Sequence, residues 1–354
     1  MATHLDARAG TAVVIGALGV ASALGLAMCD LPGEGDANEV SAEAIVTHTP
    51  EVWPPVGGDL DAELQATAIR RIGASAYDAG WDAGPGDAGP PIALPDQAEL
   101  GDIEVRRGFL DGLHYLEVVY GGASFDDALP IAFVLHGRGG NAQLPGGPFL
   151  ELSHPVRVIV PQAPERLGDG WMWIPVSVGS GLVDRLASTL FQVTSRVARF
   201  IRQVAAERPT IGRPIVTGFS QGGLLTYALA LHHDDVVGHA FPLSTWLPPP
   251  LEPLYRRDDL RYPPIRAMHG SSDPIIPIGP TRELVDRLRE RGFDVEFEEF
   301  PGVGHEMSDD MNALFHRWLE RAVCDSVGDF ACPGALAPGE DGGLPLLDAG
   351  DDAG

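Results

Sequence analysis

The sequence contains no lysine: all 24 residues counted as Lys or Arg are arginines. This absence excludes a Schiff-base lysine, a Ser–Lys catalytic pair and the lysine of a phosphate-binding P-loop. Because 50 residues are Asp or Glu, the formal net charge is −26. A chain this acidic lacks the basic partners that nucleic-acid phosphates need, so we expect no nucleic acid among its partners. We interpret the charge mainly as a source of solubility.

Cysteine is scarce as well, with three in the whole chain. Cys29 ends an apolar N-terminal segment, whereas Cys324 and Cys332 lie close together near the C-terminus. These two are expected to pair if the chain is exported, and the alternative is two unpaired thiols. Three cysteines without paired spacing do not make a zinc site, so we expect no metal centre built on them.

Long apolar runs are rare, and the clearest one covers the N-terminus. Residues 1–29 carry Arg8 ahead of an uncharged stretch, Thr11 to Met28, which is typical of an export signal. Three outcomes stay open: cleavage after Ala23, lipid attachment at Cys29, or retention as a membrane anchor. We therefore expect the chain outside the cytoplasm, either secreted or attached to a membrane through its N-terminus.

Composition divides the rest of the chain into three parts. Residues 30–99 repeat Asp-Ala-Gly and are rich in Pro and Gly, which predicts a largely disordered tether. Residues 100–323 alternate apolar and turn-forming segments and are expected to hold the folded domain. Residues 324–354 are acidic and rich in Gly and Pro, so we expect a disordered tail.

The folded part opens with a hairpin and continues as strands that alternate with helices. Asp111-Gly112 separates two strand-like segments, and this dipeptide is a strong hairpin signal. Short apolar segments predict buried strands at IAFVLHG, VRVIVPQ, PIVTGFS, HAFPLS, IRAMHGS and VEFEEFP. Helical spacing predicts helices over Val183–Glu207, Leu224–Leu231, Arg282–Arg291 and Met311–Ala322. This order predicts an α/β fold with a mostly parallel sheet, helices on both faces, and active groups at the carboxyl ends of the strands.

One serine lies between glycines where a predicted strand becomes a predicted helix. Gly218 to Gly222 spell Gly-Phe-Ser-Gln-Gly, the G-x-S-x-G pattern of a nucleophile elbow. Such a turn needs small neighbours, lifts the Ser220 hydroxyl out of the sheet and points the Gln221 N–H at the position of a developing oxyanion. The alternative is a glycine-rich turn with an idle serine.

A serine hydroxyl is a weak nucleophile that needs a base, and the base needs a third group to orient it. Asp273 follows the predicted strand IRAM and is the candidate acid, with Asp294 as its rival. His305 follows the predicted strand VEFEEF on a loop that contains glycine and is the candidate base. The order Ser220, Asp273, His305 is the one found in α/β-hydrolases.

The other histidines that we weighed fit different roles. His232 and His233 end a helical segment beside two aspartates, which indicates a solvated or capping cluster rather than a metal site. His316 lies inside a helical pattern as a surface or packing residue. His269 precedes a glycine at a strand end and is expected to hydrogen-bond locally.

A second oxyanion donor is expected from the loop after an early strand. The segment VLHGRGGNA fits, and the Arg138 N–H is the candidate donor; the alternative is a loop that only turns the chain. Trp171, Trp173 and Trp246 offer flat apolar surfaces and are candidate substrate contacts, with packing on the sheet as the alternative.

Taken together, these segments resemble the phospholipase/carboxylesterase family of α/β-hydrolases, which includes the acyl-protein thioesterases. The resemblance covers about residues 103–322. The segments that carry it are VLHGRGG, VIVPQAPERLGDGWMWIP, GFSQGGLLTYALAL, LSTWLP, MHGSSDPIIP and FPGVGHEM.

The resemblance implies a serine esterase, without metal or organic cofactor, that acts on carboxylic esters or thioesters of fairly small acyl groups. It implies Ser220 as nucleophile, His305 as base and Asp273 as the group that orients the base. It places the Arg138 and Gln221 amides in the oxyanion hole.

The chain also departs from the family. Members are typically compact and cytoplasmic, whereas this chain has a signal-like N-terminus, a tether and an acidic tail. We therefore expect ester hydrolysis outside the cytoplasm rather than an intracellular thioesterase role, and no protein partner. The short loop from Gly139 to Pro155 gives no basis for carrying over acyl-chain specificity. Two other functions stay open, namely a peptidase on the same fold and a non-catalytic, surface-tethered binding protein.

Overall fold

The computed structural model describes residues 92–94, 100–175 and 183–329. The predicted export signal with Cys29, nearly all of the predicted tether, and the predicted tail beyond residue 329 lie outside the described residues. Within the described part, no helix combines the length and the apolar character needed to cross a membrane. The predicted membrane attachment through the N-terminus stays a prediction.

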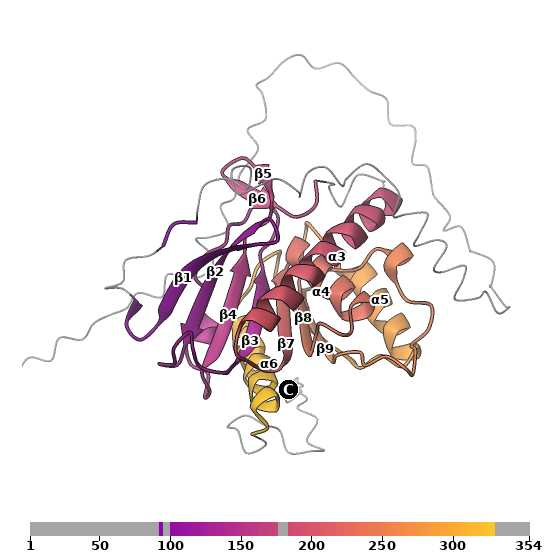
Figure 1. Ribbon diagram of the computed structural model, residues 1–354. Helices are drawn as coiled ribbons and strands as arrows, with labels where there is room; N and C mark the ends of the chain where they lie inside the picture. Colours follow the sequence, from indigo (N-terminus) through magenta and orange to yellow (C-terminus); the bar gives the residue numbers. More distant parts are fainter. Residues whose placement is uncertain (1–91, 95–99, 176–182, 330–354) are drawn as a thin grey trace, which may run out of the picture. The chain divides into compact units, whose positions relative to one another are not determined.

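An eight-stranded sheet forms the centre of the described domain, in the order β1-β2-β4-β3-β7-β8-β9-β10 (Figure 1). The strands β2 and β1 are antiparallel to each other, and β2 is antiparallel to β4. From β4 to β10 every neighbouring pair is parallel, which confirms the predicted mostly parallel sheet. The strands are β1 (Glu104–Leu110), β2 (Leu113–Tyr120), β3 (Leu129–Leu135), β4 (Val156–Pro161), β7 (Thr210–Phe219), β8 (His239–Leu243), β9 (Ile265–Gly270) and β10 (Val295–Phe300).

The opening hairpin is present where Asp111-Gly112 predicts it. Leu110 of β1 pairs with Leu113 of β2, so Asp111 and Gly112 alone form the turn. A smaller two-stranded sheet, which the sequence did not predict, is formed by β5 (Glu165–Leu167) and β6 (Gly170–Met172). It lies between β4 and the next helix along the chain.

All four predicted helices are present. They are α3 (Val183–Glu207), α4 (Gln221–His232), α5 (Ile278–Glu290) and α6 (Asp309–Val327), and short 3-10 turns occur at η2 (Gly147–Phe149) and η3 (Pro249–Leu251). Helix α6 continues beyond residue 323, so the first residues of the predicted tail are helical. Cys324 is buried in α6 and is disulfide-bonded, whereas Cys332, the partner that the sequence favours, lies outside the described residues.

Side chains that alternate along the strands build a core on each face of the sheet. Ile131 and Phe133 of β3 belong to a cluster with the apolar residues of α3, α4 and α5. Ala132, between them, belongs to the opposite cluster with α6. Helix α4 is buried along nearly its whole length because it contacts both the sheet and α3. The layers are therefore those of an α/β fold with helices on both faces.

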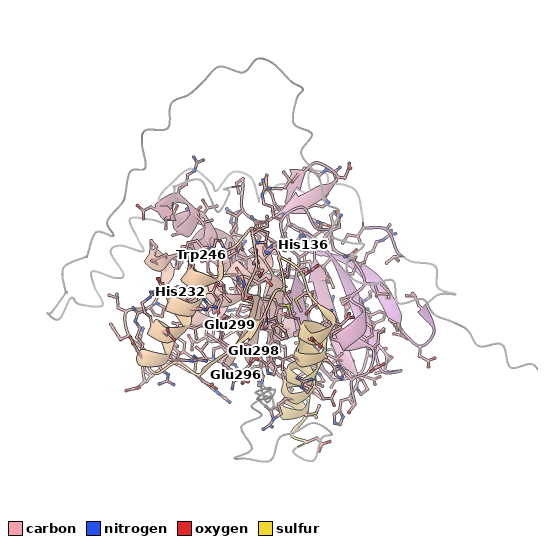
Figure 2. The ribbon with its side chains drawn as sticks, turned by 180° about the vertical axis from the view of Figure 1, so that it is seen from behind. His136, His232, Trp246, Glu296, Glu298 and Glu299 are labelled. Carbon is pink, nitrogen blue, oxygen red and sulfur yellow. The ribbon has the colours of Figure 1, made fainter. Side chains whose placement is uncertain are left out.

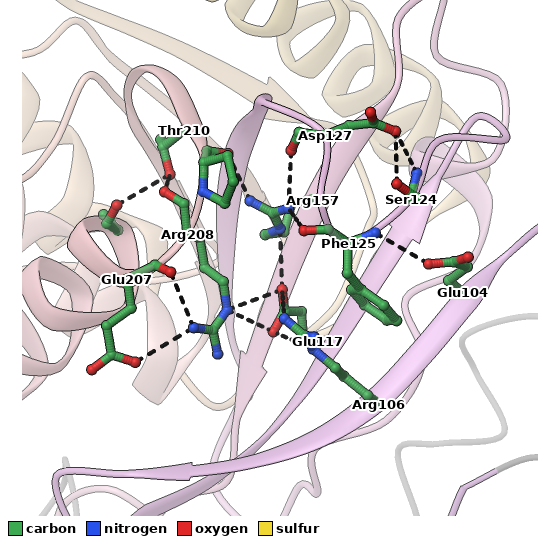
Figure 3. Close-up of polar contacts among 12 residues, drawn as sticks. Glu104, Arg106, Glu117, Ser124, Phe125, Asp127, Arg157, Glu207, Arg208 and Thr210 are labelled. Atoms are coloured by element: carbon green, nitrogen blue, oxygen red, sulfur yellow. Dashed lines mark hydrogen bonds and ion pairs between the residues drawn. The ribbon is translucent and has the colours of Figure 1, made fainter.

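A charged cluster lies where β1, β2 and β4 meet the end of α3 (Figure 3). Glu117 of β2 is fully buried, and its Oε2 accepts hydrogen bonds of 2.9 Å from both Arg106 Nε and Arg208 Nε. Arg157 Nε lies 3.1 Å from Glu117 Oε1 as an ion pair, and its Nη groups donate to backbone carbonyl oxygens of neighbouring loops. Burial lowers the pKa of Arg157, and the charge of Glu117 opposes this shift.

We expect Glu117→Gln to destabilise the domain by about 3–5 kcal/mol, the usual cost of removing one partner of a buried ion pair. Glutamine keeps the size of the side chain but leaves the Arg157 guanidinium without a buried counter-charge. Urea denaturation followed by circular dichroism gives the free energy of unfolding. Glu299→Gln, which breaks an exposed pair with Arg282, is the control and should cost less than about 1 kcal/mol. Equal losses in the two variants would contradict a stabilising role for the buried cluster.

Candidate active site

Ser220 lies in the turn between β7 and α4, in a backbone conformation that few residues other than glycine adopt. Its φ is 54° and its ψ is −114°. Its N–H donates a 2.9 Å hydrogen bond to the carbonyl oxygen of Leu243, the last residue of β8. A strained, locally fixed serine between a strand and a helix is the geometry that the G-x-S-x-G pattern predicts.

The second glycine of the pattern is required by a close backbone approach. A Cβ atom on Gly222 would lie 2.0 Å from the carbonyl oxygen of Leu135, the last residue of β3. Any side chain there would push α4 away from β3. The small residue therefore lets the elbow sit directly beside the loop that follows β3.

Three side chains from three separate loops form one hydrogen-bonded chain. His305 Nε2 lies 2.9 Å from Ser220 Oγ, and His305 Nδ1 lies 2.7 Å from Asp273 Oδ2. Asp273 follows β9, and His305 lies between β10 and α6. Each residue follows the carboxyl end of a strand, and these ends meet at one edge of the parallel sheet.

The carboxylate of Asp273 is held in a fixed orientation. It is 7% exposed, and its Oδ1 accepts hydrogen bonds from the N–H groups of Ile275 at 2.8 Å and Ile276 at 2.9 Å. The other oxygen, Oδ2, faces His305 Nδ1. Since an ionised carboxylate only accepts hydrogen bonds, Nδ1 carries the proton and Nε2 presents a lone pair to the Ser220 hydroxyl. This arrangement can remove a proton from Ser220 as its oxygen attacks an electrophile.

Asp294, His232 and His316, the alternatives to Asp273 and His305, lie elsewhere or form local hydrogen bonds. Asp294 forms an exposed ion pair with Arg266 at 2.8 Å. His232 Nε2 bonds the Leu251 carbonyl at 2.7 Å, and the ring's burial lowers its pKa. His316 Nδ1 bonds the carbonyl of Pro148 at 2.9 Å. No cluster of three or more possible metal ligands occurs within the described residues.

His269 is the exception, because it lies beside the acid. Its Nδ1 bonds the Gly270 carbonyl at 3.0 Å, as a local hydrogen bond predicts, and is 3.9 Å from Asp273 Oδ2. The ring is fully buried, which lowers its pKa and favours the neutral form. Because the neutral His269 ring carries no positive charge, it does not compete with His305 for the carboxylate of Asp273.

The loop after β3 begins at His136 and carries the exposed Arg138. His136 Nε2 accepts a 3.1 Å hydrogen bond from the Ala163 N–H, so its Nδ1 bears the proton and donates to the Gly137 carbonyl at 2.8 Å. Desolvation lowers the pKa of this ring to about 4, which keeps it neutral. Figure 2 shows His136 and Trp246 toward the same end of the molecule, the end to which β10 runs from Glu296 to Glu299.

The tryptophans predicted as substrate contacts are largely internal. Trp173 is 1% exposed and donates its Nε1–H to the His136 carbonyl at 2.9 Å. Trp171 is 6% exposed and lines a cavity of about 520 Å³ together with Leu116 and Leu144. Trp246 is partly buried against the core. Their contact with a substrate stays a prediction. The hydrogen bond from Trp173 to the His136 carbonyl is a contact that its aromatic character alone does not predict.

The side chain of Gln221 makes two hydrogen bonds that the sequence does not predict. Its Oε1 accepts a 2.7 Å hydrogen bond from the Trp173 N–H, and its Nε2 donates to the Ile174 carbonyl at 2.8 Å. The sequence marked Gln221 only for its backbone N–H. The sequence holds no signal for this contact, because its two partners lie 48 positions apart in the chain.

The chain is similar to known esterases. Residues 125–320 match the sequence profile of a family described as Phospholipase/Carboxylesterase. The chain is 28% identical to carboxylesterase SOBER1 of Arabidopsis thaliana over 151 residues, which cover 42% of this chain and 65% of that protein. It is 30% identical to acyl-protein thioesterase 1 of Gibberella zeae over 114 residues, covering 30% of this chain and 48% of the relative. A solved Bacillus cereus carboxylesterase superposes with a TM-score of 0.47 and 18% identity, covering 59% of this chain and 94% of the other.

The match to the two curated relatives spans less than two thirds of the length of either. The family profile, in contrast, covers more than half of this chain and includes the elbow, the acid and the histidine. The sheet order, the flanking helices and the strained serine after β7 fit the same family. The chain therefore belongs to the phospholipase/carboxylesterase family and has the α/β-hydrolase fold.

Proposed function

We propose that the protein is a serine hydrolase that cleaves carboxylic esters through an acyl-enzyme intermediate. The observation that carries the proposal is the hydrogen-bonded chain from Ser220 Oγ through His305 to Asp273. Relatives named carboxylesterase and acyl-protein thioesterase support the same reaction class.

In the first half of the proposed reaction, Ser220 Oγ attacks the carbonyl carbon of the ester while its proton moves to His305 Nε2. The imidazolium that forms is stabilised by the negative charge of Asp273, 2.7 Å from Nδ1. The carbonyl oxygen becomes negative in the tetrahedral intermediate. The N–H groups of Gln221 and Arg138 are the proposed donors to this oxyanion.

The intermediate then collapses to an acyl-enzyme. The bond between the carbonyl carbon and the alcohol oxygen breaks, and the departing alcohol takes the proton from His305. In the second half, a water molecule attacks the acyl carbon while His305 Nε2 accepts its proton. The acid leaves, and Ser220 Oγ regains the proton, which restores the starting state.

Thioesters fit the same steps, because their carbonyl carbon is attacked in the same way and a thiol leaves in place of the alcohol. Acyl-protein thioesterase 1 of Gibberella zeae is a relative whose name indicates this substrate class. A peptidase on the same fold and a non-catalytic binding protein are the alternatives that an experiment must separate.

Labelling with a fluorophosphonate probe tests the proposal directly. An activated serine oxygen displaces fluoride and forms a stable phosphonate ester, so mass spectrometry should find the adduct on Ser220. Ser244, the other described serine with a positive φ, at 47°, is the internal control and should stay unlabelled. Parallel assays with p-nitrophenyl butyrate and the matching p-nitroanilide should show the ester cleaved far faster. An adduct elsewhere on the protein, or preferred cleavage of the anilide, would overturn the proposal.

A further inference from the structure

The two proposed oxyanion donors belong to separate parts of the chain. The Arg138 N–H comes from the loop after β3, and the Gln221 N–H comes from the first residue of α4. Both must point at one oxygen at about 3 Å for the transition state to be stabilised. Tertiary contacts, rather than the chain between them, must therefore set their spacing.

One short segment contacts both donor regions. We name residues 171–174, with the sequence Trp-Met-Trp-Ile, the tryptophan strap. The strap begins inside β6 and ends just after it. Its two ends bond different partners.

On one side, the strap brackets Arg138. The Gly139 N–H donates to the Trp171 carbonyl at 2.7 Å, and the Trp171 N–H donates to the Gly140 carbonyl at 2.9 Å. On the other flank of Arg138, the His136 carbonyl accepts the Trp173 indole N–H at 2.9 Å. The residues before and after the donor are thus fixed to the same strap.

The approach of the two backbones is close. A Cβ atom on Gly170, next to the strap, would lie 1.9 Å from the Gly139 carbonyl oxygen. Only glycine allows this distance, so the loop of Arg138 and the start of the strap pack backbone to backbone.

On its other side, the strap is bonded to Gln221. The carboxamide of Gln221 accepts the Trp173 N–H at 2.7 Å and donates to the Ile174 carbonyl at 2.8 Å. Gln221 is 4% exposed, so neither bond competes freely with water. The residue that offers one donor through its backbone thereby holds, through its side chain, the segment that fixes the other donor.

We propose that the tryptophan strap sets the spacing of the two oxyanion donors, and that the side chains of Trp173 and Gln221 are positioning residues for oxyanion binding. This inference rests on the proposed function. Neither side chain touches the reacting atoms. Each acts through a hydrogen bond whose loss lets one donor region move relative to the other, and misplacement by about 1 Å costs a reaction of this kind roughly 100-fold.

Trp173→Phe is the sharpest test, because phenylalanine keeps an aromatic ring in the packed site and removes the donor to the His136 carbonyl together with part of the indole. We expect kcat for p-nitrophenyl butyrate to fall about 10-fold to 100-fold, while KM changes less than about 3-fold. Trp318→Phe, which replaces a partly buried indole stacked on Phe241, is the matched control and should keep the wild-type kcat.

A second readout reports on the oxyanion itself. In propyl trifluoromethyl ketone, the carbon–oxygen double bond opens as Ser220 Oγ adds to the carbon, the serine proton passes to His305, and the former ketone oxygen becomes an oxyanion. The inhibition constant of this ketone should rise in Trp173→Phe by the same factor by which kcat/KM for the ester falls. A substitution that only loosens the fold lowers the melting temperature without this proportional change.

Gln221→Met supplies an independent variant, because it keeps the backbone N–H and the side-chain length but removes both bonds to the strap. It should show the same pairing of lower kcat and weaker ketone inhibition, and it decides the question if Trp173→Phe does not fold. Wild-type kcat and ketone affinity in a folded variant of either residue overturn the inference. In that case labelling of Ser220 in the wild-type protein still stands as the test of the proposed function, so the two failures are distinguishable.

Discussion

Replacing Ser220 with alanine should lower kcat for p-nitrophenyl butyrate by about 10⁶-fold, the loss seen when the nucleophile of a comparable triad is removed. The substitution deletes the oxygen that lies 2.9 Å from His305 Nε2, so no acyl-enzyme can form. Stopped assays at high enzyme concentration measure the residual rate, which comes from oxyanion binding and proximity alone.

The fold should survive this change. Alanine has the same Cβ atom and meets the same strain at φ 54° as serine does, so circular dichroism and the melting temperature should match the wild type. Ser188→Ala, whose hydroxyl donates to the Arg185 carbonyl of its own helix, is the control and should retain full activity. Unchanged hydrolysis by folded Ser220→Ala would rule out the proposed mechanism.

Asp273→Asn should lower kcat by about 10⁴-fold, because the asparagine imposes the wrong tautomer on His305. Two backbone N–H groups, from Ile275 and Ile276, already point at Oδ1, so this position must remain an oxygen. The asparagine NH₂ group then faces His305 Nδ1. To avoid two donors in contact, Nδ1 must become an acceptor and Nε2 must carry the proton, which leaves no lone pair for Ser220.

Asp294→Asn is the matched control for this prediction. It makes the same chemical change at an exposed aspartate that pairs with Arg266, and we expect activity within about 2-fold of the wild type, as is usual for surface substitutions. Proton NMR of the downfield Nδ1–H signal of His305 should show the resonance lost in Asp273→Asn and kept in the control. A resonance that persists in Asp273→Asn would contradict the tautomer argument.

Features set by local geometry could be predicted from the sequence. The glycines around Ser220 follow from a steric demand within a few residues, since a Cβ atom on Gly218 would lie 2.4 Å from the backbone of Gly222. The strands and helices follow from apolar periodicity, so their order and the parallel sheet were predictable. The meeting of Ser220, Asp273 and His305 followed from a rule of this fold class, that the carboxyl ends of parallel strands share one edge.

Contacts between distant segments could not be predicted in this way. The bonds from Gln221 to the strap join a side chain to a backbone that no periodic pattern places nearby. The aromatic character of Trp173 favours a substrate contact, yet its indole N–H donates to the internal carbonyl of His136. The arginines around Glu117 come from β1, β4 and the end of α3, and their convergence depends on the pairing of β2 with both neighbouring strands.

The place of His305 has a consequence for biosynthesis. The imidazole lies on the loop between β10, an edge strand of the sheet, and α6, the helix that packs in the same apolar cluster as Ala132. A nascent polypeptide still attached to the ribosome therefore holds the elbow long before it holds the base. We expect hydrolytic power to arise only when β10 and α6 have left the exit tunnel, so an unfinished chain stays chemically inert toward esters.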